Sequence, residues 1–298
     1  PVSAATAPPA TRAPASAWAR AWEVTRHLIG TSRPLSWINT AYPFAVAYLL
    51  GGGPVGWPFA VGVAYFLIPY NLLMYGVNDV FDYESDLRNP RKGGVEGIVL
   101  PRRWHRATLW AAAATNLPAI GYLATVSPPG ALAVLAVSVF AVVAYSAPGL
   151  RFKERPLLDS LTSATHFVSP AVYGLTLTGA PLDWTAAACL AGFFLWAMAS
   201  HAFGAVQDIT ADRAAGLASV ATWLGATRTV RLALILYAGA ALVLATTGWP
   251  AALTALLVVP YLASAAPYRH LDDDHCEQAH PGWRRFLWLN LATGFVLT

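Results

Sequence analysis

Asn78, Asp79, Asp82 and Asp86 form a polar cluster at the end of a long apolar run. The three aspartates are separated by steps of three and four residues, and on an α-helix these steps place side chains on one face. Carboxylates held so close repel one another and stay ionised only beside a cation, and Mg²⁺ prefers oxygen ligands. The spacing therefore predicts a magnesium site on one helical face.

Basic residues follow this cluster directly, at Arg88, Arg91 and Lys92. A second acidic pair, Asp208 and Asp212, is one helical turn apart and is followed by Arg213. Acidic residues that hold a metal, next to basic residues that attract an anion, indicate a site for a metal-bridged phosphate or diphosphate.

The composition is that of a membrane protein. Of the 298 residues, 56% are hydrophobic and 11% are charged, whereas ordinary soluble domains carry about 25% charged residues. The mean hydropathy of +0.49 agrees. We expect an all-α polytopic membrane protein in which residues 18–298 form a single transmembrane domain. Residues 1–17, rich in Ala, Pro and Ser, are predicted to be a disordered tail.

Nine apolar segments are candidate membrane spans, which predicts a bundle of nine transmembrane helices surrounded by membrane lipids. They cover roughly residues 35–51, 57–76, 105–125, 130–146, 159–178, 184–204, 229–247, 250–267 and 283–298.

The basic residues are divided unequally between the two sides of this predicted bundle. All 19 Lys and Arg residues lie in the N-terminal region or near the loops after the second, fourth, sixth and eighth spans. The positive-inside rule then places the N-terminus and these loops in the cytoplasm, and nine spans place the C-terminus outside the plasma membrane. This distribution also accounts for the pI near 9.2, so we expect no nucleic-acid partner.

Both acidic clusters lie at the cytoplasmic ends of their spans, the second and the sixth, so we expect them to face each other across one cavity. A solvated helix end is the alternative for the first cluster. Three carboxylates on one face at the membrane boundary make that alternative costly.

Other polar residues near these ends allow two interpretations each. Arg151, Lys153 and Arg155 are either ordinary cytoplasmic charge or partners for a diphosphate leaving group. Asn39 and Gln207 either bond to neighbouring helices or contact metal or phosphate. The lone histidines His166 and His201 are more often structural, with proton transfer as the minority role.

Two further features are open to more than one interpretation. The acidic run 272–280 has metal-ligand residue types without a standard spacing, which favours a solvated patch over a zinc site. Aromatic faces can stabilise an allylic carbocation, and six aromatic residues are candidates to line a cavity: Tyr70, Tyr145, Phe167, Tyr173, Phe193 and Phe194.

The two acidic motifs resemble those of a known family. N-D-V-F-D-Y-E-S-D at 78–86 is similar to the NDxxDxxxD motif of the UbiA superfamily of intramembrane prenyltransferases, and D-I-T-A-D at 208–212 is similar to its second, DxxxD motif. The resemblance covers nearly the whole chain and implies Mg²⁺-dependent ionisation of an allylic diphosphate, with prenyl transfer to a lipophilic acceptor.

Four further segments look like the lycopene elongase branch of this superfamily: residues 32–44, 89–97, 151–160 and 203–208. This likeness implies extension of lycopene with C5 units from dimethylallyl diphosphate to C45 and C50 carotenoids, with or without hydration, and allows for partner subunits of the carotenoid pathway. At the position of Gln207, many relatives that use aromatic acceptors have a different polar residue. The open alternatives are a quinone-precursor, chlorophyllide or glycerol-phosphate acceptor, or a cation-coupled transporter.

These patterns predict the roles of individual residues. Mg²⁺ and the diphosphate would be held by Asn78, Asp79, Asp82, Asp86, Asp208 and Asp212. Lys153 would act with these aspartates in catalysis. Substrate contacts are expected from Asn39, Arg88, Lys92, Tyr145, Arg151, Arg155, His166, His201, Gln207 and Arg213.

Overall fold

The computed structural model describes residues 16–87 and 99–297, and this part of the chain is helical without β-strands. The longer helices are α1 (Ala17–Thr31), α2 (Pro34–Leu50), α3 (Trp57–Leu67), α4 (Pro69–Phe81), α6 (Arg102–Val126), α7 (Pro129–Ser146), α8 (Leu158–Leu177), α9 (Trp184–Val206), α12 (Ala226–Ala245) and α14 (His280–Leu297). Shorter elements are α5 (Tyr83–Asp86), η1 (Phe152–Glu154), α10 (Ile209–Ala214), α11 (Val220–Leu224), η2 (Ala251–Val258), α13 (Val259–Ala265), η3 (Ala266–Tyr268) and η4 (Cys276–Ala279).

Each of the nine predicted spans coincides with helical structure in the described part of the chain. Six segments are long and apolar enough to cross a membrane: Trp57–Phe81, Arg102–Val126, Pro129–Ser146, Trp184–Val206, Ala226–Ala245 and Ala251–Tyr268. The remaining three spans, α2, α8 and α14, fall short, because α2 has only 17 residues and the other two carry more polar residues. The all-helical prediction is confirmed, and six of the nine predicted membrane crossings are supported by length and composition.

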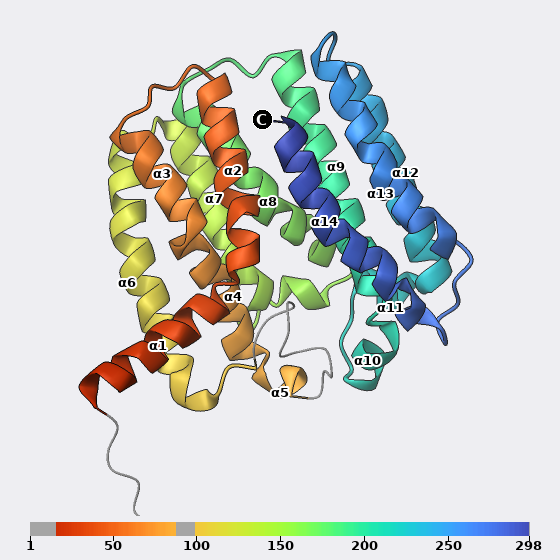
Figure 1. Cartoon of the computed structure of the whole chain (residues 1–298), viewed down its shortest axis with the longest axis horizontal. Coiled ribbons are helices and arrows are strands. Elements are labelled where there is room, and N and C mark those ends of the chain that lie inside the picture. The colour runs from red at the N-terminus through yellow and green to blue at the C-terminus, as the bar shows by residue number, and fades with distance from the viewer. Residues whose placement is uncertain (1–15, 88–98, 298) are drawn as a thin grey trace, which may run out of the picture.

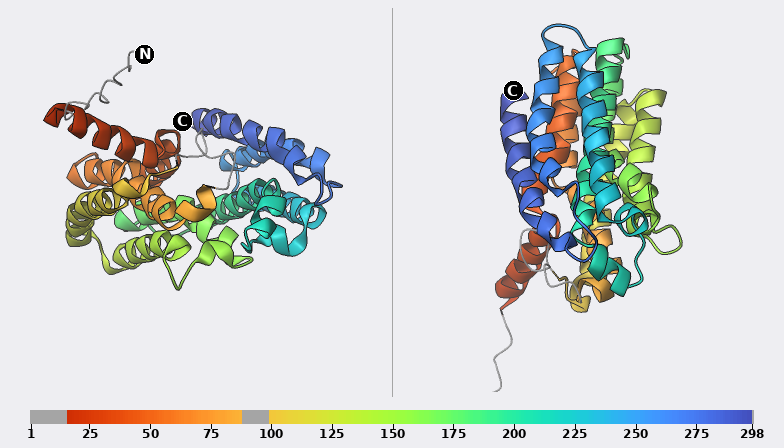
Figure 2. Two further views of the ribbon diagram at one scale, coloured as in Figure 1. Left: turned by 90° about the horizontal axis from the view of Figure 1, so that it is seen from below. Right: turned by 90° about the vertical axis from the view of Figure 1, so that its right-hand side faces the viewer.

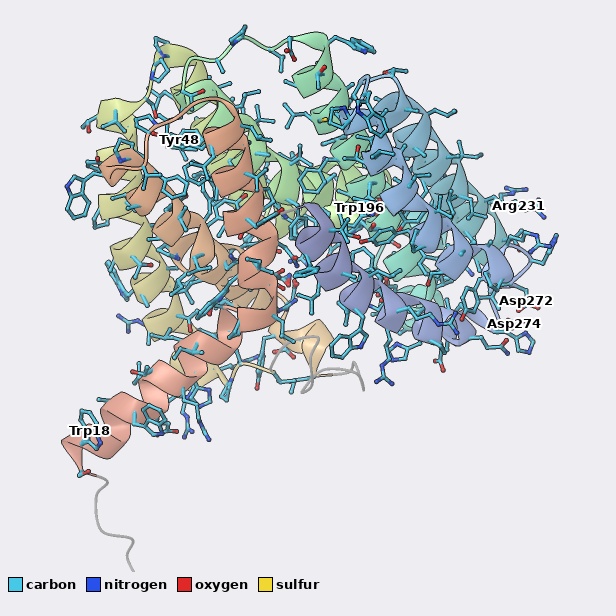
Figure 3. The ribbon with its side chains drawn as sticks, turned by 45° about the horizontal axis from the view of Figure 1, so that its top comes forward. Trp18, Tyr48, Trp196, Arg231, Asp272 and Asp274 are labelled. Atoms are coloured by element: carbon cyan, nitrogen blue, oxygen red, sulfur yellow. The ribbon has the colours of Figure 1, made fainter. Side chains whose placement is uncertain are left out.

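The long helices run side by side along one axis of the molecule (Figures 1 and 2). The short helices α5, α10 and α11 gather at one end, where α6 and α14 also begin. Helix α1 lies obliquely across that same end, with Trp18 at its far tip (Figure 3). The sequence patterns did not predict α1, which already includes Ala17 of the expected tail.

Two hydrophobic cores hold the bundle together. The N-terminal core joins α2, α3, α4, α6, α7 and α8 around fully buried rings such as Phe44, Phe66 and Tyr173. The C-terminal core joins α9, α12 and α13 around Tyr237 and Tyr261. Contacts between α8 and α9 connect the two cores.

The second predicted span is broken at Pro69, where α3 ends and α4 begins. Proline lacks a backbone N–H, and exposed carbonyl groups are costly in a membrane. Asn71 compensates: its Nδ2 donates to the carbonyl oxygens of Phe66 at 2.9 Å and Leu67 at 3.1 Å. Thr40 Oγ1 also donates to Phe66 O at 2.6 Å. These bonds hold the break between α3 and α4 against α2.

The first acidic motif is not one continuous helical face. Helix α4 ends at Phe81, Asp82 occupies the C-cap, and α5 starts at Tyr83. Asp79 and Asp82 therefore turn to different partners, which corrects the prediction that the motif lies on one helix.

Gly174 allows α2 and α8 to approach closely. A methyl group there would lie 2.5 Å from the carbonyl oxygen of Phe44 and 3.1 Å from the amide nitrogen of Tyr48. Because both neighbours are backbone atoms, the helices would have to separate.

We therefore expect Gly174→Ala to lower the free energy of unfolding by about 1–3 kcal/mol. Thermal unfolding in detergent would measure the change. Gly121→Ala on α6 is the matched control, because a methyl group there meets open space. An unchanged midpoint for Gly174→Ala would show that the contact between α2 and α8 is less tight than described.

Candidate active site

A cavity of about 1660 Å³ lies between the two cores and is lined by residues of α2, α4, α7, α8, α9 and α14. Its charged end receives both acidic motifs together with a lysine: Asn78, Asp82, Lys153, Asp208 and Asp212. Away from that end the lining is mainly apolar, with residues such as Val46, Phe167, Leu175, Phe193 and Leu287. The structure thus brings residues about 130 positions apart in sequence to one cavity.

Asp82 is a buried carboxylate on this cavity, with 5% of its surface exposed. Lys153 Nζ forms an ion pair with it, and Asn78 Nδ2 donates a hydrogen bond to it. Arg151 adds a longer contact of 3.6 Å. Asn78 Nδ2 also donates to Ser146 Oγ at 3.1 Å, which connects the motif to α7. These contacts neutralise a charge that would otherwise be costly to bury.

Asp79 is fully buried behind this cluster, where Arg33 donates to its Oδ1 at 3.0 Å. The guanidinium of Arg33 also lies over the Tyr75 ring, 4.2 Å from its centroid. Arg33 lines the cavity, and its buried Nε has no hydrogen-bond acceptor in the described part of the chain. It adopts a left-handed conformation with φ of 51°, just before Pro34 at the start of α2. The sequence analysis did not assign this residue to the site, although it is a basic residue directly before the first predicted span.

The basic loop between α7 and α8 uses its three cations differently. Lys153 lines the cavity. Arg151 Nε donates to Glu154 at 2.6 Å, and this hydrogen bond lowers the pKa of Glu154 and raises that of Arg151. Arg155 lies over the Phe152 ring, 5.9 Å from its centroid, and donates to the Gly149 carbonyl oxygen. Only Lys153 of the three predicted cations lies on the main cavity.

The second acidic motif spans the junction of α9 and α10. Asp208 precedes α10 and Asp212 lies within it, and the Asp212 amide donates to the Asp208 carbonyl oxygen at 2.8 Å. Arg213 instead pairs with Asp273 at 2.7 Å and donates to Thr222 O at 2.9 Å. Arg213 therefore turns toward the loop before η4 and does not line the cavity.

Part of the acidic run 272–280 is structural. The Ala226 amide donates to Asp273 at 2.6 Å, and this bond, with Arg213, lowers the pKa of Asp273. Asp272 is exposed and pairs with His275 at 2.7 Å. Figure 3 shows Asp272 and Asp274 near Arg231 at the edge of the bundle.

Asp159, at the start of α8, also lines the cavity although the sequence patterns did not single it out. Its two oxygens accept from the backbone amides of Ser160 at 2.8 Å and Val220 at 2.7 Å. Residue 220 begins α11, so this fully buried carboxylate ties the two halves of the bundle together below the cavity.

The remaining predicted site residues divide into two groups. Asn39, Tyr145, His166, His201 and Gln207 line the cavity. The Gln207 amide is bonded within the protein, to Gly204 O at 3.1 Å and to His280 Nδ1 at 2.6 Å. Arg88 and Lys92 lie outside the described residues, as does the side chain of Asp86.

The aromatic candidates also divide. Tyr145, Phe167 and Phe193 line the cavity, whereas Tyr70 and Tyr173 belong to the N-terminal core. Phe194 packs against a small cluster of buried residues between α8 and α9. Trp196, which was not predicted, lies inside the bundle on α9 and lines the cavity (Figure 3).

The donor set at the charged end suits magnesium. Asn78, Asp82, Asp208 and Asp212 offer only oxygen ligands, and Mg²⁺ is commonly bound by one or two carboxylates together with water and substrate phosphates. Among the described residues, no three His, Cys, Asp or Glu side chains lie close enough to hold a metal by themselves. The oxygen donors of these residues fit a magnesium ion that takes its other ligands from water and from a substrate phosphate.

Comparison with known proteins identifies the family. The profile of the UbiA prenyltransferase family matches residues 40–291. The chain belongs to this family. The predicted resemblance to the superfamily is thereby confirmed. The prediction of an intramembrane prenyltransferase therefore holds over the alternative of a cation-coupled transporter.

Curated relatives of this UbiA-family chain point to one branch. A lycopene elongase/hydratase from Corynebacterium glutamicum is 51% identical over 276 residues, covering 93% of this chain and 96% of the relative. The C(50) beta-cyclic carotenoids biosynthesis protein LbtBC from Dietzia sp. is 55% identical over 272 residues, covering 91% of this chain and 63% of the relative. The predicted likeness to the lycopene elongase branch is therefore confirmed.

A solved structure shares the fold. The UbiA homolog from Archaeoglobus fulgidus, bound to DMAPP and Mg²⁺, aligns with a TM-score of 0.65 at 19% identity, covering 91% of this chain and 99% of the homolog. The two proteins therefore share one fold.

We predict that Asp82→Ala lowers turnover by at least about 10²-fold while the protein still inserts, because a metal ligand and a partner of Lys153 are lost together. Mg²⁺-dependent pyrophosphate release by purified protein would measure it. Asp82→Asn, which keeps a polar group for Lys153, separates loss of charge from loss of folding. Asp272→Ala, on the exposed edge, is the matched control. Normal turnover in both Asp82 variants would contradict a metal site at Asp82.

Proposed function

We propose that this chain transfers C5 prenyl groups from dimethylallyl diphosphate to lycopene in a Mg²⁺-dependent reaction, giving C45 and C50 carotenoids. One structural observation supports this most strongly. A single cavity joins a charged end, with both acidic motifs and Lys153, to a long apolar remainder. At about 1660 Å³, it exceeds the roughly 300–1,000 Å³ clefts that suit drug-sized ligands.

Both motifs would hold the donor by its diphosphate. Asn78, Asp82, Asp208 and Asp212 would bind Mg²⁺, with Asp79 behind them, and Asp86 remains a predicted ligand. Bound Mg²⁺ supplies positive charge that stabilises the diphosphate as the C–O bond breaks.

The chain's own cations would share that task. Lys153 lies on the cavity, and the unpaired Nε–H of Arg33 is available to a phosphate oxygen. Arg88 and Lys92 remain predicted contributors from outside the described residues. Arg151 would act indirectly, through its contact with Asp82 and its pairing with Glu154.

The apolar part of the cavity would protect the allylic cation. Aromatic faces stabilise cations, and exclusion of water prevents early capture. Tyr75, Tyr145, Phe167 and Trp196 line the cavity. The terminal double bond of the acceptor would attack the cation, which forms a new C–C bond and leaves a tertiary cation on the acceptor.

The lining favours an acceptor without polar groups. Many polar side chains on the cavity are already bonded within the protein, such as Ser200, Thr254 and Asn290. Few are left to satisfy an acceptor that carries several hydroxyl groups. The relatives named lycopene elongase/hydratase support lycopene as the acceptor and water addition as a second outcome.

The same proposal includes an orientation in the plasma membrane. Nine helices would span it, with the charged end of the cavity and the N-terminus in the cytoplasm and the C-terminus outside.

Single cysteines placed at residues 151–156 and 179–183, in a variant without Cys189 and Cys276, would check this orientation. An impermeant reagent on intact cells should label only the second loop.

We expect purified protein with Mg²⁺ and dimethylallyl diphosphate to add one or two C5 units to lycopene. Mass analysis of the carotenoids and a pyrophosphate assay would measure the reaction. Parallel reactions with 4-hydroxybenzoate and a naphthoate, each with C5 and longer donors, test the alternative acceptors. Transfer to an aromatic acid with lycopene untouched would contradict the proposed acceptor, and absence of pyrophosphate release with every pair would contradict prenyl transfer itself.

A further inference from the structure

The proposed reaction leaves one chemical task without a residue. After the new C–C bond forms, the acceptor carries a tertiary cation, and a proton must leave before a stable product exists. The proton comes either from a carbon beside the cation or from a water molecule that has added to it. Both routes need a group that accepts one proton near the apolar part of the cavity.

Most groups on the cavity that can accept a proton are already engaged. Asp159 accepts two backbone amides, and Asp183, at the opposite end of the bundle, caps α9 by accepting from the Ala186 amide at 2.8 Å. Asp82, Asp208 and Asp212 belong to the charged end, where the metal and diphosphate are proposed to bind. Glu154 also lines the cavity and is paired with Arg151, so the two histidines remain.

His201 and His166 differ in their ring contacts. Both nitrogens of His201 have partners: Nε2 lies 3.2 Å from Tyr145 Oη, and Nδ1 lies 3.1 Å from Ser160 Oγ. His166 is only 3% exposed, lines the cavity, and its Nε2 has no hydrogen-bond partner among the described residues. A buried, unpaired ring nitrogen costs free energy unless a ligand or water uses it.

The position of His166 along α8 suits the task. Asp159, Ser163, Phe167, Ala171 and Leu175 line the cavity from the same helix. At about 1.5 Å per residue, His166 lies roughly 10 Å further along α8 than Asp159. It therefore lies beyond the charged end, at the start of the apolar lining.

The surroundings of His166 hold it in place. Its backbone carbonyl accepts from Tyr70 Oη at 3.3 Å, and Ser138 Oγ donates to the same Tyr70 oxygen at 3.0 Å. The Tyr145 ring lies at 5.1 Å between centroids and 79° to the imidazole. This perpendicular packing fixes the orientation of the imidazole ring.

We propose that His166 is the general base that removes the proton ending each prenyl transfer, an inference that rests on the proposed prenyltransferase function. The neutral imidazole, with its own proton on Nδ1, uses the lone pair on Nε2. In elongation it takes a proton from the carbon beside the cation, and the C–H electron pair becomes a double bond. In hydration it takes the proton from the water oxygen that has bonded to the cationic carbon, leaving a tertiary alcohol.

The charges balance in both routes. The leaving diphosphate keeps the electron pair of the broken C–O bond, and the positive charge moves from carbon to the imidazolium. Product departure admits water, and the proton then passes to the solvent or to the pyrophosphate.

The test compares His166→Ala, His166→Gln and His201→Ala in detergent, with dimethylallyl diphosphate, Mg²⁺ and lycopene. We expect both His166 variants to form prenylated product about 10²-fold or more slowly. Their affinity for the donor diphosphate should stay within about twofold, since the base acts after ionisation.

Added imidazole distinguishes a base from a structural residue. It should restore product formation by His166→Ala at least about tenfold, by supplying the missing base, and should leave His201→Ala unimproved. Product formation by His166→Ala within about threefold of wild type would overturn the proposal. So would loss without rescue in a variant that still binds the donor normally.

The test of His166 can be evaluated independently of the identity of the acceptor. If the wild type prenylates another acceptor in place of lycopene, the acceptor proposal fails, while His166 is judged on that product. Every carbon acceptor must lose a proton after the new bond forms, so the same expectations apply.

Discussion

The ion pair between Asp82 and Lys153 is the interaction on which the charged end of the bundle depends. Asp82 ends α4 inside a largely apolar molecule, where an uncompensated carboxylate could not stay ionised at tolerable cost. The ion pair with Lys153 holds η1 against Asp82. Asn78 donates to both Asp82 and Ser146, which connects the same carboxylate to α7. Breaking such a buried pair commonly costs about 3–5 kcal/mol, so the contacts that prepare the site also fix three elements around it.

A second carboxylate closes the other side of that end. Asp159 bonds to the first amide of α11 as well as to its own helix, which holds the α9–α11 region against α8. The bundle thus has two apolar cores with polar connections between them at one end and an apolar cavity above. A donor with a charged head and a hydrocarbon tail suits this division: the head among cations and oxygen ligands, the tail among aromatic and aliphatic side chains.

The sequence predicted those parts of the site that depend on the local spacing of residues and on which ends of the helices lie on the same side of the bundle. Asp82, Asn78, Asp208 and Asp212 share a cavity because both motifs end spans that point the same way. Arg33 was missed because its pairing with Asp79, 46 positions away, depends on a left-handed residue before α2. Arg213 was predicted to lie at the site because it directly follows Asp212 in sequence. Its actual partner, Asp273, lies 60 positions away, which the local sequence cannot show. The end of α4 at Phe81, next to the ion pair of Asp82 with Lys153, is likewise a feature that helical periodicity does not show.

The central claim is that the two acidic motifs hold one diphosphate through shared magnesium. A double-mutant cycle with Asp82→Asn and Asp208→Asn, read as Mg²⁺-dependent binding of a non-hydrolysable dimethylallyl diphosphate analogue by calorimetry, tests it most directly. A shared site predicts that either change alone removes most of the binding and that the double variant loses little more, a coupling of at least about 1 kcal/mol. Losses that add to within about 0.5 kcal/mol would show two independent sites and contradict the claim.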